Sequence, residues 1–395
     1  MGQRRRDVTR RDFLRTSALG GAALAGLGSA GLAQPGEAPR LPRRKLGRTA
    51  LEVSLVGYGT EFINDRALVE HLLAEGVNHV DTAVLYQSGN AERQLAPILA
   101  DHPDTIVATK FLRTIPADAP KEAYLADFEG SCERMQRQSV DILYLHDRRT
   151  AESVECPGAK QAVDELKAAG RVKHFGVSTH LGQAAVAQKA VELGWFDVLL
   201  AAHNFLSPAS DAEALKAAAD AGMGVVVMKV LRAVAPGEDW YPRATEEQRA
   251  VLEAANIYQA AIRWALSREY VSSAVLCIAN HDEAAVDLEA ARDPALGDRE
   301  ARALGAYRQL AGATICRGCG ACERACPRRV AVSDILRFAA YARTYREPAA
   351  ARAKYAALDE ARTVTACGEC WACEAACPYG LAVRGRLREA HEVLA

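Results

Sequence analysis

Four side chains that could move a proton follow three short apolar runs in the first half of the chain. Asp81 and Tyr86 follow the first run, Lys110 ends the second and His146 ends the third. A phenol has an unperturbed pKa of about 10, so it is a poor acid near neutrality unless a cation lies beside it. We therefore expect Lys110 to lower the pKa of Tyr86 and make it a proton donor.

The runs that carry these residues belong to a regular alternation of short apolar and Ala-rich segments. Strand-like runs occupy residues 51–58, 79–83, 105–110, 140–146, 174–178, 197–203, 224–230 and 273–279. Helix-like segments occupy 66–76, 90–101, 121–135, 158–169, 182–193, 211–221, 258–267 and 282–292. Eight strand–helix units predict an α/β fold, a (β/α)8 TIM barrel, whose active site lies at the carboxyl ends of its strands.

Several short motifs resemble those of the aldo-keto reductase family over roughly residues 43–293. They are Leu46-Gly47-Arg48-Thr49, Gly57-Tyr58-Gly59-Thr60, Asp81-Thr82-Ala83 with Tyr86, Gly89 and Glu92, then Lys110, His146 and Gly176-Val177-Ser178. The resemblance implies an oxidoreductase that interconverts a carbonyl and an alcohol on a small-molecule substrate. Tyr86 would protonate the carbonyl oxygen, Asp81 would hold Lys110, and His146 would orient the carbonyl or share the proton relay.

Each of these residues has an ordinary alternative when it is taken alone. A strand-end Asp often caps a turn, a single His is often a buried core residue, and a strand-end Lys is often solvated. Their order at the ends of three successive strands favours the catalytic interpretation.

The resemblance also implies a nicotinamide nucleotide, NADP(H), and the positions that would contact it. These positions are Thr60, Ser178, Thr179, His203 and Asn280.

The nucleotide positions depart from the family pattern in their residue types. Thr179 stands where family members usually have Asn, Leu200 stands where they have Gln, and His203 stands at the position of the ring that stacks on the nicotinamide. The run 277–283 after the eighth strand contains no arginine for the 2′-phosphate and ends in Asp282-Glu283. A guanidinium is the usual charge-assisted anchor for a phosphate, so NADP(H) use is in question.

Eight cysteines near the C-terminus form two copies of one spacing. They are Cys316, Cys319, Cys322 and Cys326, then Cys367, Cys370, Cys373 and Cys377, and each set ends in Cys-Pro. This is the bacterial ferredoxin spacing for [4Fe-4S] clusters, and the eight matches with both prolines favour clusters over zinc or disulfides.

Two-cluster ferredoxins imply that the fourth cysteine of each motif binds the other cluster. One cluster would then have Cys316, Cys319, Cys322 and Cys377 as ligands, and the second would have Cys367, Cys370, Cys373 and Cys326. The spacer 333–362 is rich in Ala and Arg and predicts helices, so residues 301–395 would form an α-helical two-cluster ferredoxin-like domain. Aldo-keto reductases with a ferredoxin-like tail are a known branch of the family.

The remaining composition constrains the partners. The other three cysteines fall in expected helices or a strand, where we expect them to be buried packing residues; they are Cys132, Cys156 and Cys277. Four arginines lie in or next to the first motif, where they could tune the potential of a cluster, dock an acidic partner or be solvated; they are Arg317, Arg324, Arg328 and Arg329. The clusters themselves would pass electrons singly to or from an external one-electron carrier protein. The net charge is −1, and no basic stripe with interleaved aromatics predicts binding to nucleic acid.

The N-terminus resembles a twin-arginine (Tat) export signal. Arg10-Arg11 is followed by Phe13 and Leu14, then by an uncharged Gly- and Ala-rich run over 18–32. That run is shorter than the ~20 apolar residues that span a membrane, although an uncleaved anchor is the alternative. We expect residues 1–33 to engage the Tat export machinery and the rest, beginning with a barrel over 34–300, to be periplasmic.

Together these features predict an exported oxidoreductase in which a Tyr/Lys/Asp/His relay serves a carbonyl–alcohol interconversion and two clusters pass electrons singly. The alternative function is an iron–sulfur electron-transfer protein whose barrel is only a scaffold. A third possibility is a ligand-binding barrel whose clusters serve folding alone.

Overall fold

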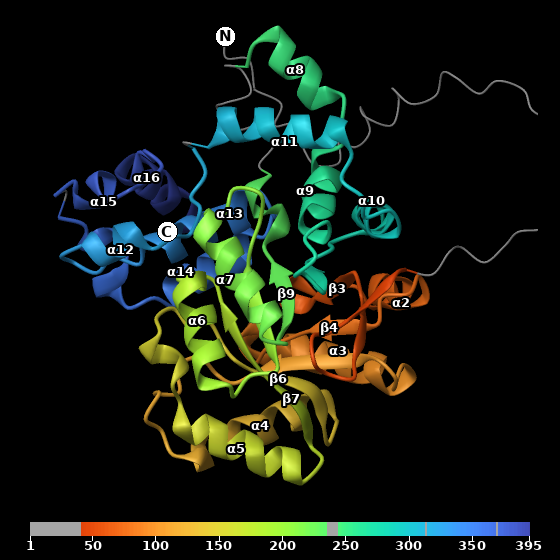
Figure 1. Ribbon diagram of the computed structural model, residues 1–395. Coiled ribbons are helices and arrows are strands. Elements are labelled where there is room, and N and C mark those ends of the chain that lie inside the picture. The colour runs from red at the N-terminus through yellow and green to blue at the C-terminus, as the bar shows by residue number, and fades with distance from the viewer. Residues whose placement is uncertain (1–40, 235–243, 313, 369) are drawn as a thin grey trace, which may run out of the picture.

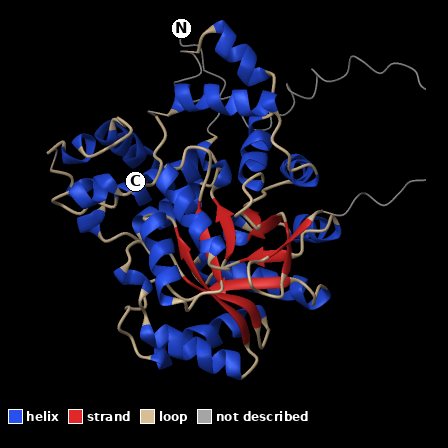
Figure 2. Cartoon of the chain, viewed as in Figure 1, coloured by secondary structure: helices blue, strands red, loops and turns tan. Residues whose placement is uncertain are grey.

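A closed eight-stranded parallel barrel forms the centre of the protein in a computed structural model that describes residues 41–234, 244–312, 314–368 and 370–395. The strands are paired in the order β10-β3-β4-β5-β6-β7-β8-β9. Figures 1 and 2 show this barrel surrounded by helices, with the C-terminal helices beside it. The barrel strands are β3 (Val56–Gly59), β4 (His79–Asp81), β5 (Ile106–Lys110), β6 (Val140–Leu145), β7 (Val172–Thr179), β8 (Val198–Ala202), β9 (Gly224–Met228) and β10 (Ser273–Leu276).

Eight helices alternate with these strands, as the sequence predicts, and the (β/α)8 fold is confirmed. They are α2 (Arg66–Ala74), α3 (Asn90–Asp101), α4 (Lys121–Met135), α5 (Pro157–Ala168), α6 (Gln183–Leu193), α7 (Ala209–Asp220), α9 (Ile257–Leu266) and α10 (His281–Arg292). Local sequence sets their ends: Asp65 caps the start of α2 by accepting hydrogen bonds from Ala67 and Leu68, and Gly194 ends α6 in the left-handed conformation.

Alternation along the strands decides which side chains face the barrel interior. Ala108, Ile142 and Tyr144 belong to the interior cluster, whereas Val107, Leu143 and Leu145 pack outward against the helices. Because successive side chains point to opposite faces, Lys110 and His146 share the inward phase of their strands. The alternation of side chains along β5 and β6 therefore places Lys110 and His146 at the same end of the barrel interior.

The opposite end of the barrel is closed by a short hairpin and a buried imidazole. The sequence predicts one strand over 51–58, but the structure divides it into β2 (Glu52–Ser54), paired antiparallel with β1 (Arg43–Lys45), and the barrel strand β3. His79 fills the space that a side chain at Gly57 would occupy, since a Cβ there would lie 2.0 Å from its Nε2 atom.

Two helices that the sequence did not predict extend the barrel. They are α8 (Glu246–Glu253) and α11 (Asp298–Ala311), which pack together with α9 in a separate apolar cluster. The expected domain boundary between residues 300 and 301 falls inside α11. We therefore place the boundary after Ala311, since the Ala-rich start of the expected tail is a barrel-side helix.

The C-terminal domain is helical and covers the barrel mouth. Its helices are α12 (Ala321–Ala325), α13 (Val332–Arg343), α14 (Pro348–Ala356), α15 (Ala372–Ala375) and α16 (Val383–Leu394). Phe62, in the turn after β3, packs edge-on against Tyr341 of α13 with 5.4 Å between ring centroids. Glu61 pairs with Lys354 of α14 at 3.1 Å. The two domains therefore share a packed and charged interface.

A buried charge network fastens α13 to the barrel. Arg149, in the loop after β6, binds both carboxylate oxygens of Asp334 at 2.8 and 2.9 Å and also pairs with Asp147 at 2.7 Å. Arg337 contacts Asp334 at 2.5 Å, and Arg113 contacts Asp147 at 3.1 Å. Both carboxylates are almost wholly buried, so each guanidinium contact compensates a desolvated charge.

The expected signal at residues 1–33 lies outside the described residues. Within the part of the chain that the structure describes, no helix combines the length and apolar character needed to cross a bilayer.

Candidate active site and cluster domain

The structure brings Asp81, Tyr86 and Lys110 into direct contact at the barrel mouth. The Lys110 ammonium donates to Asp81 Oδ1 at 2.5 Å and to the Thr82 carbonyl at 2.7 Å. It also lies 4.7 Å from the centroid of the Tyr86 ring. His146 meets that ring edge-on at 6.2 Å, and all four expected relay residues are buried.

Burial controls the charges of these groups. Desolvation raises the pKa of Asp81 and lowers that of Lys110, and the ion pair between them offsets this cost. Burial also holds the pKa of His146 well below its ordinary value, helped by the nearby Lys110 charge, so its imidazole is neutral near pH 7.

The expected lowering of the Tyr86 pKa is wrong. Burial, followed by the carboxylates of Asp81 and Glu61, raises the pKa of Tyr86 well above 10. The physical reason is that Lys110 is already bound to Asp81, so the pair presents little net positive charge to the phenol. Tyr86 therefore keeps its proton across the physiological range and is arranged to give a proton rather than to take one.

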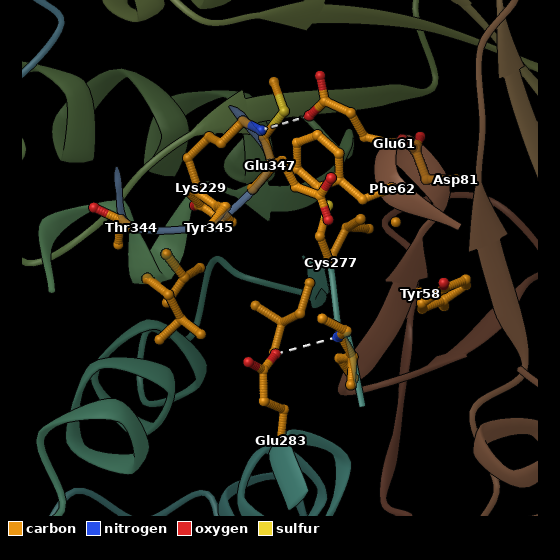
Figure 3. A pocket seen from close by; sticks show the side chains of 18 of the residues that line it. Tyr58, Glu61, Phe62, Asp81, Lys229, Cys277, Glu283, Thr344, Tyr345 and Glu347 are labelled. Carbon is orange, nitrogen blue, oxygen red and sulfur yellow. Dashed lines mark hydrogen bonds and ion pairs between the residues drawn. The ribbon is translucent and has the colours of Figure 1, made fainter. Parts of the chain in front are cut away.

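A cavity of about 270 Å³ opens beside Asp81 and Tyr86, and both domains line it. On the barrel side it is walled by the ends of β3, β9 and β10, including Tyr58 and Cys277 (Figure 3). The segment 344–347 that follows α13 forms another wall, and Figure 3 shows Thr344 and Tyr345 approaching from this segment. Its volume is at the small end for a ligand pocket, roughly 300–1,000 Å³.

A second buried lysine–carboxylate pair, which the sequence analysis missed, lies in this cavity. Lys229 donates to Glu61 at 2.9 Å (Figure 3). Its ammonium also lies 4.7 Å from the centroid of the Tyr341 ring. Burial opposes both charges, but each partner stabilises the other: the pKa of Glu61 is held well below its usual value and that of Lys229 well above. Lys229 adopts the left-handed backbone conformation, with φ of 58°. The sequence does not indicate this conformation, because the residue is not glycine.

Four of the expected nucleotide-contact residues are buried, and the hydroxyl groups of two of them are hydrogen-bonded to the protein backbone. Ser178 accepts from the Asp147 N–H and donates to the Leu145 carbonyl, while Thr179 donates to the Leu181 carbonyl. Thr60 is fully buried, and its hydroxyl oxygen has no hydrogen-bond partner among the residues that the structure describes.

His203 is not brought to the cavity. Its ring packs against Trp264 of α9, and its Nε2 atom lies 3.1 Å from the Tyr270 hydroxyl. The neighbouring Ala202 faces the interior cluster and Ala201 the outer one, so alternation turns position 203 outward. His203 therefore does not supply an aromatic ring that could stack on a nicotinamide.

Asn280 does line the cavity, but its surroundings do not fit a phosphate. Its side chain caps α10 by accepting from the Glu283 N–H at 2.9 Å. The Glu283 carboxylate accepts from the Ala279 N–H at 3.1 Å, so the start of this helix already holds an anion of the protein's own. Glu347 adds a second carboxylate to the lining, so the start of α10 does not fit the 2′-phosphate of NADP(H); the cations that line the cavity, Arg346 and the paired Lys229, lie on other elements.

The fourth cysteine of the second motif joins the first motif in the structure. A small void is lined by Cys316, Cys319, Cys322 and Cys377 together with apolar residues such as Leu381. The void thus contains the ligand set that the ferredoxin resemblance implies for one cluster. Thiolates gathered in an apolar shell are the donor set that an iron–sulfur cluster requires, so these residues fit the group.

The other four cluster cysteines differ in their exposure, and Cys326 and Cys367 are partly buried. Cys373 is buried, and burial together with the neighbouring Cys367 raises the pKa of its thiol. Cys370 is exposed. None of the cysteines forms a disulfide. Within the described residues, no group of three or more His, Cys, Asp or Glu side chains is arranged to hold a single metal ion.

Comparisons with known proteins agree with this architecture. The model of the aldo/keto reductase family matches residues 59–304, and that of a 4Fe-4S dicluster domain matches residues 315–382. Since the first match spans more than half of the chain, the protein belongs to the aldo/keto reductase family. It is an oxidoreductase of this family that carries a 4Fe-4S dicluster domain.

Individual relatives are distant. Pyridoxal 4-dehydrogenase of Microbacterium luteolum is 27% identical over 241 residues, covering 48% of this chain and 70% of that protein. L-galactose dehydrogenase of Arabidopsis thaliana is 26% identical over 274 residues, covering 60% of this chain and 84% of that protein. An aldo-keto reductase of Bacillus halodurans in its holo form has the same fold, with a TM-score of 0.58, 20% identity and coverage of 70% of this chain and 98% of its own.

Proposed function

We propose that this protein interconverts a small-molecule carbonyl and an alcohol in the cavity beside Tyr86, and that its electrons travel through the two clusters. The observation that carries the proposal is the shared cavity. The expected proton donor Tyr86 lines it from the barrel, and Thr344 and Tyr345 line it from the dicluster domain.

The cavity is also close to the first cluster site. Thr344 borders a second, smaller void, which is lined by Cys316 and by Arg232 from the turn after β9. The same residue therefore separates the substrate cavity from a void that reaches a cluster ligand. This arrangement supports electron exchange between the barrel and the dicluster domain.

The proton and electron requirements divide between the two domains. Reducing a carbonyl to an alcohol takes up two electrons and two protons, whereas each [4Fe-4S] cluster would pass electrons one at a time. A hydride carrier bound in the cavity would therefore have to collect two electrons and one proton and deliver them together as the hydride that forms the new C–H bond. Tyr86 would donate the proton that reaches the carbonyl oxygen, and its raised pKa keeps that proton available. Asp81 would hold Lys110 against the phenol, and neutral His146 would orient the oxygen through its ring nitrogens.

We do not route electrons through NADP(H). The Glu283 carboxylate at the start of α10 and the hydroxyl groups of Ser178 and Thr179, which are bonded to the backbone, support a reaction that uses the clusters instead. A periplasmic location, reached through the signal at residues 1–33, would also separate the enzyme from the cytoplasmic nucleotide pool. Changing Arg10 and Arg11 to Lys should leave the protein in the cytoplasm; equal periplasmic yield would disprove this route.

The catalytic proposal is tested by replacing Tyr86 with Phe in the anaerobically purified holoprotein. Reduction of a panel of carbonyl compounds is followed with reduced methyl viologen as the electron donor. We expect turnover to fall at least about 100-fold, because general acid catalysis contributes about 10²–10⁴-fold. Tyr58→Phe is the matched control, since this tyrosine lines the same cavity outside the relay.

Equal turnover of wild type and Tyr86→Phe with every compound would contradict the proposal. That result would favour the alternative function, an electron-transfer protein with a barrel scaffold. The cluster absorbance should be unchanged in both variants, because neither tyrosine lines the voids that contain the cluster cysteines.

A further inference from the structure

The two cluster motifs differ at one equivalent position, which follows the second cysteine of each motif. Gly320 stands there in the first motif and Trp371 in the second, and both residues adopt the left-handed backbone conformation, with φ of 71° and 62°. Glycine enters this conformation without steric cost, whereas a residue with a Cβ does not. The second motif thus accepts backbone strain in order to place an indole beside its cluster.

The indole is held in a fixed orientation on the surface. Trp371 is 59% exposed, the most exposed large apolar side chain among the described residues. One face of its ring is stacked on the Arg384 guanidinium, 3.8 Å from the ring. The equivalent Gly320 is buried, so only the second motif presents a rigid aromatic group to the solvent.

The two cluster sites also face different surroundings. Gly318 of the first motif lies against the barrel loops, because a Cβ there would meet the His180 carbonyl and Leu181 at 3.5 Å. Cys370 of the second motif is exposed, and Figure 1 shows α15 at the outer side of the tail. The first site is therefore proximal to the barrel cavity and the second is distal.

Exposed arginines lie on the elements that adjoin the second motif. Arg328 is exposed and lies within 3.5 Å of the position of a Cβ at Gly368, between the two motifs. Arg324 and Arg329 are exposed on the adjoining α12 and its following turn, and α12 packs against α15. We name Trp371, Arg324, Arg328 and Arg329 the distal face; Glu369, which lies outside the described residues, is not counted in it.

The nearest described carboxylates are turned to the backbone. Glu323 accepts from the Ser333 N–H at 2.7 Å, and Glu374 accepts from the Arg384 N–H at 3.0 Å. These equivalent bonds tie each motif to the helix that follows it.

We propose that the distal face is the docking site for an acidic one-electron carrier protein, which exchanges electrons with the distal cluster. An exposed tryptophan that is stacked on one arginine and adjoins an arginine-rich helix end has the composition of an interface hot spot, and the positive charge would steer an acidic partner. Electrons would pass one at a time from the carrier to the distal cluster, then to the proximal cluster. This inference concerns the dicluster domain and does not depend on which substrate the barrel takes.

The test compares a protein donor with a small donor on the intact holoprotein. Stopped-flow absorbance follows cluster reduction by a reduced acidic flavodoxin and, separately, by dithionite, which needs no docking site. Trp371→Gly installs the residue found in the first motif and so preserves the backbone conformation. Arg302→Gln, an exposed arginine on α11, is the control for a general change in charge.

We expect Trp371→Gly to slow reduction by flavodoxin at least about tenfold and to leave reduction by dithionite unchanged. Arg328→Gln should weaken the dependence of the flavodoxin rate on salt, whereas Arg302→Gln should not. A Trp371→Gly protein that flavodoxin reduces at the wild-type rate would overturn the proposal. Equal slowing with both donors would also overturn it, since that result would indicate damage to the cluster rather than to docking.

Discussion

The ion-pair network between the barrel and α13 allows one prediction to be worked through in detail. Replacing Arg149 with Met keeps most of the apolar length of the side chain but removes the guanidinium that binds Asp147 and Asp334. The two carboxylates are only 2% and 3% exposed, so neither can recover solvation without movement of the domains.

The size of the effect follows from what remains around the carboxylates. Breaking a buried ion pair by removing one partner costs about 3–5 kcal/mol, because a buried charge is left uncompensated. Asp334 keeps Arg337 at 2.5 Å and Asp147 keeps Arg113 at 3.1 Å, so we expect the low end of that range, about 3 kcal/mol. That loss would raise the equilibrium constant for opening the interface by roughly two orders of magnitude.

Native-state hydrogen exchange of the α13 amides measures this opening, and it does not require the two domains to unfold together. Arg66→Met is the matched control, since Arg66 also bridges two carboxylates at 2.6 Å but does so on the exposed surface. We expect the control to change stability by less than about 1 kcal/mol.

Two results would refute the reasoning. The first is an α13 exchange rate in Arg149→Met that rises no more than in Arg66→Met. The second concerns the cause: adding Asp147→Asn to Arg149→Met removes one uncompensated charge and should restore part of the protection. A double variant no better protected than the single one would mean that stranded charge is not the source of the loss.

Three further predictions concern the relay, the clusters and acid stability. Lys110→Met should leave Asp81 unpaired beside Tyr86 and raise the phenol pKa further, so the alkaline limb of the pH profile for alcohol oxidation should move upward; an unmoved limb would contradict the electrostatic coupling. Cys377→Ala should remove the proximal cluster and about half of the iron while the EPR signal of the distal cluster persists, and loss of the distal signal alone would disprove the crossed ligand sets. Arg149 holds the pKa of Asp147 at about 2 against burial, below its ordinary 3.8, so this carboxylate should contribute roughly 2–3 kcal/mol above about pH 4 that is lost as the pH falls toward 2; unfolding free energies measured across this window should show the decline, and a flat profile would contradict it.

The barrel could be predicted from the sequence because its signals are local. Short apolar strands, Ala-rich helices and terminal glycines recur at the period of one strand–helix unit, and alternation along β5 and β6 already places Lys110 and His146 on one face. The sequence predicts one strand over 51–58, whereas the structure has two, because a hairpin strand and a barrel strand show the same apolar alternation. Nothing in that alternation shows which neighbour a strand will pair with.

The rest of the site could not be predicted because it depends on contacts between domains. Glu61 and Lys229 are separated by most of the barrel sequence. Tyr345 reaches their cavity from a different domain, and Tyr341 of that domain lies against Lys229. The raised pKa of Tyr86 likewise depends on burial and on the distant Glu61 carboxylate, neither of which its own strand reveals. The cysteine motifs were predictable since their spacing is itself the signal.

The cover that the tail places on the barrel mouth has a consequence for how such an enzyme can be rebuilt. Phe62 has its aromatic partner on α13, and Glu61 takes one of its two ammonium partners from α14. The two domains therefore cannot be exchanged independently. A different ferredoxin domain joined to this barrel would leave the Phe62 ring without Tyr341 and the Glu61 carboxylate without Lys354. A working chimera would have to inherit the turn after β3 together with the tail.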